Sequence, residues 1–172
     1  QTIVSRNADP QETAVLSITQ IQSGEAYNVI PHKAYMKGTA RTFSNEIMAL
    51  IETNLTRLSK SIAEGMGAAA EVDFRITFPP LINSEQEIEF AGDVAAKLVG
   101  KENVNRMSNR VMGSEDFAYM SNLIPGGYVT IGQGEGKWGC EVHNPHYDFN
   151  DEILSLGASY WAKLVETKLA KE

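Results

Sequence analysis

The residues best suited to metal or nucleophilic chemistry lie in one short stretch, EVHNPHYDFND, which spans residues 141–151. His143 and His146 flank an Asn-Pro pair there, and a carboxylate follows them. A catalytic zinc-type centre takes about three protein ligands and keeps an open position. The two histidines do not have the i, i+4 spacing of helix-borne ligands, so spacing alone indicates no complete metal centre. It favours a polar surface turn, with a single metal ligand as the alternative.

Two further soft donors, Cys140 and His32, lie outside any recognisable ligand spacing. A lone cysteine without a positioned base is usually neither a nucleophile nor a ligand. His32 follows a proline in an expected turn, where we expect a solvated side chain. Neither residue therefore supports a site by itself.

A second candidate for chemistry is the stretch GSED, residues 113–116, which places two adjacent carboxylates beside a hydroxyl. One interpretation makes Glu115 or Asp116 part of a polar site. The other makes Ser114 the N-cap of a short helix whose first turn carries acids, a pattern favoured by the helix dipole. Without context, capping is the favoured interpretation.

A third candidate pair is Asn28 and Arg41, which lie on or beside two predicted strands. If those strands form a hairpin, we expect both side chains to reach one rim. An arginine clamps a carboxylate through its planar fork, and an asparagine donates to an oxyanion. The alternative is an ordinary surface arginine and an asparagine in a turn.

The elements that must position these residues follow from hydrophobic periodicity. In the first half, we predict a helix end before Pro10, strands over 14–21 and 34–43, and a helix over 44–67 capped by Ser44 or Asn45. Strict alternation over 71–78 predicts a further strand, which Pro79-Pro80 ends.

The second half is predicted to be more helical. Ser84 and Glu87 form a capping box that opens a helix ending at Gly100. A short helix is expected within 112–123, and a strand buried on both faces over 127–132. A last helix over 151–169 is expected to bury one apolar face, formed by Ile153, Leu154, Trp161, Leu164 and Val165.

Composition narrows the class of protein further. The chain has 172 residues, 42% of them hydrophobic and 22% charged, as in ordinary globular proteins. A net charge of −7 argues against a nucleic-acid partner, and the apolar runs are too short for a membrane span. The single cysteine cannot form an intramolecular disulfide, which fits a reducing compartment and predicts a cytoplasmic protein.

Three segments taken together resemble one known family. AYNVIPHKAYMKGTARTF, VMGSEDFAYM and VHNPHYDFNDEILSLGASYWAKLVE are similar, in this order, to the aminoacylase and hippurate hydrolase branch of the binuclear metallopeptidases. That branch also includes indole-acetyl-amino-acid hydrolases. The resemblance covers nearly the whole chain, and the three motifs together are specific although each alone is weak.

The resemblance implies an α/β (α+β) fold with two domains. Residues 1–82 would be most of a ferredoxin-like lid or dimerisation domain that lacks its first strand and most of its first helix. Residues 83–172 would be the C-terminal part of an α/β/α catalytic domain. Such enzymes bind two divalent metal ions, such as zinc or manganese, and cleave the amide bond of N-acyl amino acids. A homodimer formed through the lid is also implied.

The resemblance assigns roles to the candidate residues. His143, at the head of HNP, matches a metal-ligand histidine, whereas His146 falls where no ligand is expected. Asn28 and Arg41 match lid residues that bind the tetrahedral oxyanion and the substrate carboxylate. Gly113, Ser114 and Glu115 match a turn near the active site.

The departures from the family pattern are equally informative. The Cys-x-His ligand pair, the Glu-Glu pair that includes the general base, a further histidine ligand and a lid histidine would all lie upstream of Gln1. Cys140 lies in the wrong segment to replace the cysteine ligand, and Asn144 stands where close relatives carry a second histidine. We therefore expect a catalytically silent fragment with an unoccupied metal centre. The alternatives are a non-catalytic dimerisation or small-molecule-binding module, and a regulatory amino-acid-binding domain.

Overall fold

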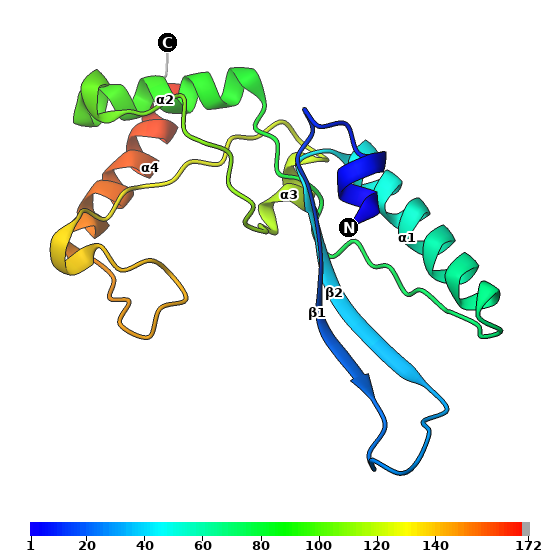
Figure 1. The fold of residues 1–172 in the computed structure, drawn as a ribbon. Coiled ribbons are helices and arrows are strands. Elements are labelled where there is room, and N and C mark those ends of the chain that lie inside the picture. Colours follow the sequence, from blue (N-terminus) through cyan, green and yellow to red (C-terminus); the bar gives the residue numbers. More distant parts are fainter. Residues whose placement is uncertain (170–172) are drawn as a thin grey trace. The chain divides into compact units, whose positions relative to one another are not determined.

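The computed structural model describes residues 1–169, which form a mixture of helices and strands, as predicted (Figure 1). The chain divides into two compact units. Unit 1 contains residues 1–81 and 111–119, and unit 2 contains residues 82–110 and those from 120 onward. In chain order the elements are η1 (Ile3–Asn7), β1 (Ala14–Ser23), β2 (Ala34–Thr42), α1 (Asn45–Gly65), α2 (Glu85–Val99), η2 (Lys101–Asn103), α3 (Phe117–Ser121), η3 (Gly136–Trp138), η4 (Asp151–Ile153) and α4 (Leu154–Lys168).

Unit 1 is built on the antiparallel hairpin of β1 and β2, which confirms both predicted strands. The register runs from Ala14 opposite Thr42 to Ser23 opposite Ala34, with an irregularity near Thr19. Gly38 lies at this irregularity, and a Cβ atom there would stand 2.1 Å from the Ser17 carbonyl oxygen. The close approach of the two backbones therefore requires glycine at this position.

Helix α1 covers the end of the hairpin that is remote from the connecting loop. Ile3, Ile47 and Ile51 form the buried core. The half-buried side chains packed against them are Ala14, Leu16, Ala40, Leu55, Leu58 and Phe74. Ser44 begins the helix as predicted, because its Oγ accepts a hydrogen bond from the Ile47 amide at 3.2 Å.

The prediction of a strand over residues 71–78 is wrong. The described residues contain one sheet, and it has only the strands β1 and β2. Phe74 packs against the core and Val72 is half-buried, but Ile76 and Phe78, which were expected on the same side, are exposed. However, side-chain alternation cannot supply a neighbouring strand, and a strand exists only where its backbone pairs with another.

In unit 2, helices α2 and α4 pack against each other. Val94 and Tyr160 are buried there, and the Tyr160 hydroxyl donates to the Ala91 carbonyl oxygen at 3.3 Å. Burial raises the pKa of Tyr160, because the phenolate would lose its hydration. Gly100 ends α2 with a φ of 88°, as the sequence predicted.

The capping box predicted at Ser84 is wrong, and so is the strand over 127–132. The Ser84 Oγ accepts from the Gly126 amide at 3.1 Å and caps no amide of its own helix. Next to it, the Asn83 side chain accepts from the Tyr128 amide at 2.7 Å and donates to the Tyr128 carbonyl oxygen at 3.2 Å. These side-chain bonds occupy backbone groups of the 126–128 segment that a neighbouring strand would otherwise pair.

The predicted last helix is confirmed as η4 followed by α4, but its expected buried face is only partly buried. Leu154, Trp161 and Val165 are exposed, at 59%, 66% and 57%. Ile153 and Leu164 are half-buried. The helical period correctly placed these residues on one side, but too few described residues pack against that side to cover it. No helix among residues 1–169 is both long and apolar enough to span a membrane.

Candidate functional site

His143 has an unusual backbone conformation. It lies in unit 2, in the loop formed by residues 134–149 (orange in Figure 1), and its side chain is exposed. Its φ is 68°, and it is the only described residue other than glycine with a positive φ. A side chain in this left-handed region costs about 1–3 kcal/mol, and such residues cluster at functional sites. The structure therefore singles out the same histidine as the sequence resemblance does.

The turn predicted around Asn144 and Pro145 is confirmed. The Asn144 amide donates to the Glu141 carbonyl oxygen at 3.3 Å, and the Asn144 Oδ1 accepts from the His146 amide at 2.9 Å. Its carbonyl oxygen also accepts from the Tyr147 amide at 3.0 Å. An asparagine side chain that bonds to the backbone two residues ahead forms an Asx turn. This turn directly follows His143 and limits its freedom.

Two polar side chains tie together the ends of the loop that carries His143, and sequence reasoning missed both. Asn150, which is buried, donates from Nδ2 to the Gln133 carbonyl oxygen at 2.8 Å. The Gln133 side chain donates to the Trp138 carbonyl oxygen at 2.8 Å and accepts from the Tyr147 hydroxyl at 3.3 Å. The Asn-Asp-Glu start of the last helix was a usable signal for Asn150 as an N-cap. No feature of the sequence indicated a structural role for Gln133.

Arg41 and the 113–115 turn are brought together in unit 1. The Arg41 Nη1 donates to the Met112 carbonyl oxygen at 2.7 Å. This bond uses one of the five N–H donors of the guanidinium group. The sequence contains no signal for it, because the acceptor is a backbone oxygen 71 residues away.

The 113–116 turn opens a short helix, as predicted. The carbonyl oxygen of Glu115 accepts from the Ala118 amide at 3.3 Å, and the carboxylate of Glu115 accepts from the Phe117 amide at 3.5 Å. At this helix start, therefore, the side chain that accepts a hydrogen bond from a backbone amide is that of Glu115. The capping interpretation had assigned this role to Ser114. Gly113 and Ser114 are exposed beside it.

Asn28 is held apart from Arg41 by the hairpin that contains both. Asn28 lies in the loop beyond the pair Ser23 and Ala34, whereas Arg41 is opposite Val15 near the other end. Strands rise about 3.3 Å per residue, so the seven residues from Ala34 to Arg41 span roughly 23 Å. The expectation that both side chains reach one rim is therefore wrong within a single chain.

The described residues form no complete metal centre. They contain no group of three or more histidine, cysteine, aspartate or glutamate side chains that could hold one ion. A dinuclear centre needs several such donors, so the described residues do not form one by themselves. His143, the candidate ligand indicated by the sequence, is exposed and lies in a loop with a constrained backbone.

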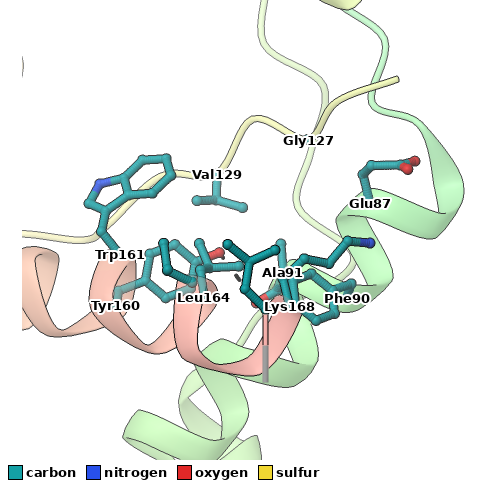
Figure 2. A pocket seen from close by; sticks show the side chains of 11 residues that line it. Glu87, Phe90, Ala91, Gly127, Val129, Tyr160, Trp161, Leu164 and Lys168 are labelled. Carbon is teal, nitrogen blue, oxygen red and sulfur yellow. Dashed lines mark hydrogen bonds between the residues drawn. The ribbon is translucent and has the colours of Figure 1, made fainter. Parts of the chain in front are cut away.

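A cavity of about 380 Å³ lies between α2, α4 and the 127–129 segment of unit 2 (Figure 2). Its walls are mostly apolar, with Glu87 and Lys168 as the charged lining residues. None of the candidate site residues, which are Asn28, Arg41, residues 113–115 and His143, lines it. The cavity continues the incompletely covered side of α4, because Trp161 and Val165 line it.

Comparisons with known proteins agree with the motifs. The sequence pattern of peptidase family M20/M25/M40 matches residues 3–167. The hippurate hydrolase of Campylobacter jejuni is 35% identical over 164 residues, which cover 95% of this chain and 42% of that protein. The N-acetylcysteine deacetylase of Bacillus subtilis is 36% identical over 165 residues, again covering 95% of this chain and 42% of that protein. The IAA-amino acid hydrolase ILR1-like 4 of Arabidopsis thaliana is 32% identical, covering 95% of this chain and 38% of that protein.

Solved structures show the same relationship. The Bacillus subtilis YXEP protein, described as a dinuclear metal binding peptidase from the M20 family, matches with a TM-score of 0.77 and 33% identity. The match covers 92% of this chain and 43% of that chain. A putative aminohydrolase from Staphylococcus aureus matches with a TM-score of 0.80 and 25% identity. This chain spans about two fifths of the length of the curated relatives it matches, and it belongs to peptidase family M20/M25/M40.

Proposed function

We propose that the protein carrying this chain hydrolyses the amide bond of N-acyl amino acids, with hippurate-like substrates. The observation that carries the proposal is the match along 95% of the chain to a hippurate hydrolase and to an N-acetylcysteine deacetylase. Both names describe an acyl group removed from the nitrogen of an amino acid. A substrate of that kind offers a carboxylate, an amide carbonyl and a variable acyl group.

The substrate-binding roles fall to Arg41 and Asn28 in this proposal. Arg41 binds the carboxylate of the amino acid, and its remaining N–H donors suit a bidentate pair. Its bond to the Met112 carbonyl oxygen supports this role, because it holds the guanidinium beside the 113–115 turn. Asn28 stabilises the oxyanion that forms on the acyl carbonyl.

The proposal assigns residues 1–82 to a ferredoxin-like lid and residues 83–172 to the C-terminal part of the catalytic domain. His143 supplies one ligand to a centre of two divalent ions, which would provide Lewis-acid activation when bound. The general base and the other ligands belong to parts of the protein outside this chain. The chain alone is accordingly proposed to be inactive.

A homodimer formed through the hairpin completes the proposal. Asn28 lies beyond Ala34, which is itself roughly 23 Å along the hairpin from Arg41, so a second copy would bring an Asn28 to the Arg41 side of a site. The half of the hairpin near the loop also exposes apolar side chains, among them Ile21 and Met36. Exposed strand edges of this kind readily pair with another chain.

The test is hydrolysis of N-benzoylglycine, N-acetylcysteine and an indole-acetyl amino acid by the purified protein that carries this chain. Arg41→Ala should raise KM roughly 10- to 100-fold, because a charge-assisted pair with the substrate carboxylate is lost. Arg57→Ala is the matched control, since the exposed Arg57 donates to the Asn54 side chain on α1 and has no proposed role. Absence of hydrolysis for all three substrates would refute the proposed activity, and an unchanged KM for Arg41→Ala would refute the role of that residue.

A further inference from the structure

We infer that Gln133 and Asn150 are positioning residues that hold the 134–149 loop closed and so present His143 in one backbone conformation. The role of His143 in this inference rests on the proposed function. The role of the two polar side chains rests on the geometry of the loop alone. Asn150 lies in the stretch EVHNPHYDFND, where the sequence indicated no role for it, and Gln133 lies outside the three motifs.

Asn150 joins the two ends of the loop to the start of the last helix. Only 6% of this residue is exposed, and both ends of its amide group are bonded. Its Nδ2 donates to the Gln133 carbonyl oxygen at 2.8 Å, and its Oδ1 accepts from the Glu152 amide at 3.0 Å. Because a buried amide is costly unless its polar atoms are bonded, both bonds are needed together. The loop is thus closed on an element with regular structure.

Gln133 extends this closure into both arms of the loop. Its Nε2 donates to the Trp138 carbonyl oxygen on the first arm, and its Oε1 accepts from the Tyr147 hydroxyl on the second arm. One side chain therefore links the segment before His143 with the segment after it. The bonds lie across the base and middle of the loop, and the tip with His143 is left free to contact a ligand.

The loop needs such bracing for two physical reasons. Gly134, Gly136 and His143 all have positive φ, and a glycine-rich loop loses much conformational entropy when it becomes ordered. His143 additionally adopts a backbone conformation that histidine disfavours. Without bonds that outweigh these terms, His143 would relax to the ordinary conformations of an unconstrained loop.

Asn150→Asp tests the inference with a minimal change. Aspartate keeps the oxygen that accepts from the Glu152 amide but removes the donor to the Gln133 carbonyl oxygen. Asn103→Asp is the matched control, because the Asn103 Nδ2 also donates to a backbone carbonyl, that of Val99, at 2.8 Å and outside the loop. If Asn150→Asp fails to fold, Gln133→Glu makes the corresponding change, since it removes the donor to Trp138 and keeps the acceptor for Tyr147.

The first measurement is the rate of trypsin cleavage after Lys137, which lies in the first arm of the loop. Proteolysis follows the population of the open form, so loss of one bond should raise the rate roughly tenfold in Asn150→Asp. Asn103→Asp should be cleaved like the unmodified chain. An unchanged rate in Asn150→Asp, or an equal rise in the control, would overturn the inference.

The second measurement is Zn²⁺ binding by the protein that carries the chain, determined by competition with a chromophoric chelator. Loss of a group that orients a metal ligand typically weakens binding or activity about 10- to 100-fold. If Asn150→Asp opens the loop and leaves Zn²⁺ affinity unchanged, the positioning role is refuted while the proposed hydrolysis stands. If the unmodified protein hydrolyses no N-acyl amino acid, the proposed function fails, and the trypsin comparison still decides whether the two side chains brace the loop.

Discussion

Two irregular segments of the chain carry proposed site residues, and they are held in different ways. The loop of residues 24–33 at the end of the hairpin carries Asn28. Within it the Val29 amide donates to the Ala26 carbonyl oxygen, and the hydroxyl of Ser23, which precedes the loop, donates to the Lys33 carbonyl oxygen. Its apolar side chains Tyr27 and Ile30 are almost entirely exposed. The loop of residues 134–149 carries His143 and is crossed at its base by side-chain hydrogen bonds.

The difference indicates where each loop obtains its order. The 134–149 loop is organised by its own chain, so His143 can be in place before a ligand arrives. The hairpin loop projects into solvent, and its apolar side chains gain contacts only when another surface covers them. We therefore expect substitutions in the 134–149 loop to change chemistry within one chain. Substitutions near the hairpin loop of residues 24–33 should change the association of two chains.

Substitution of His143 should give the largest effect. His143→Gly is expected to reduce hydrolysis by more than about 100-fold, because removing a ligand exceeds the loss of an outer partner. The same change should leave the free energy of unfolding unchanged or raise it by about 1 kcal/mol, because glycine adopts positive φ without strain. Urea unfolding and hydrolysis assays measure the two effects separately.

His146→Ala is the control for this experiment, since His146 lies in the same loop and has no proposed role. It should leave hydrolysis within a few-fold of the unmodified protein. Equal losses for the two histidines would remove the distinction drawn between them. A marked destabilisation by His143→Gly would show that the histidine is kept for folding.

Substitution on the exposed half of the hairpin should give a smaller effect, on association. Met36→Lys places a charge on a strand surface that we propose to be covered in the dimer, and burying an unpaired charge there is costly. The dimer dissociation constant should rise at least roughly tenfold. Light scattering over a dilution series measures it.

Met66→Lys provides the comparison, because Met66 is also an exposed methionine and lies at the end of α1, away from the hairpin surface. It should leave the dissociation constant unchanged. A protein that is monomeric before any substitution would refute the dimer and would leave Asn28 without a site to reach.

The smallest effect concerns α1, the helix that supports the hairpin. Ser44→Ala should lower the free energy of unfolding by about 1 kcal/mol through loss of the N-cap. The Ser44 hydroxyl also donates to the Glu46 carboxylate at 2.7 Å, which lowers the pKa of Glu46, as does the backbone amide of that residue. A group with a lowered folded pKa contributes stability above its unfolded pKa and loses it as pH falls through the folded pKa.

The difference in unfolding free energy between Ser44→Ala and the unmodified chain should therefore shrink in acid. Urea unfolding at neutral pH and near pH 3 tests this sign.

In Ser84→Ala, hydrogen exchange of the first α2 amides should not change, since the Ser84 Oγ accepts from the Gly126 amide. Faster exchange there would contradict the difference between the two helix starts.

Local sequence signals were sufficient for elements whose partners are close in the chain. The helical period placed Ile47 and Ile51 on the buried face of α1, and Ser44 marked its start. The hairpin followed from two neighbouring extended stretches. The same kind of signal failed at residues 71–78 and 127–132, where burial was indicated but no described strand lies alongside.

The candidate site shows the same division. His143 and the 113–115 turn could be chosen from motifs, because a family pattern preserves the order and type of such residues along the chain. The distance between Asn28 and Arg41 could not be read from their spacing, because it depends on where the loop falls within the hairpin register.

The sequence by itself determined the family, the helices α1, α2 and α4 and the Ser44 cap of α1, and it indicated His143 as the histidine proposed to bind a metal. These depend on residue type, order and periodicity, which are properties of the chain. Only the tertiary structure decided that Arg41 bonds to the Met112 carbonyl oxygen, that His143 has a positive φ, and that Gln133 and Asn150 close its loop. Those features depend on backbone atoms brought together by folding, and a backbone carbonyl has the same chemistry whichever residue carries it.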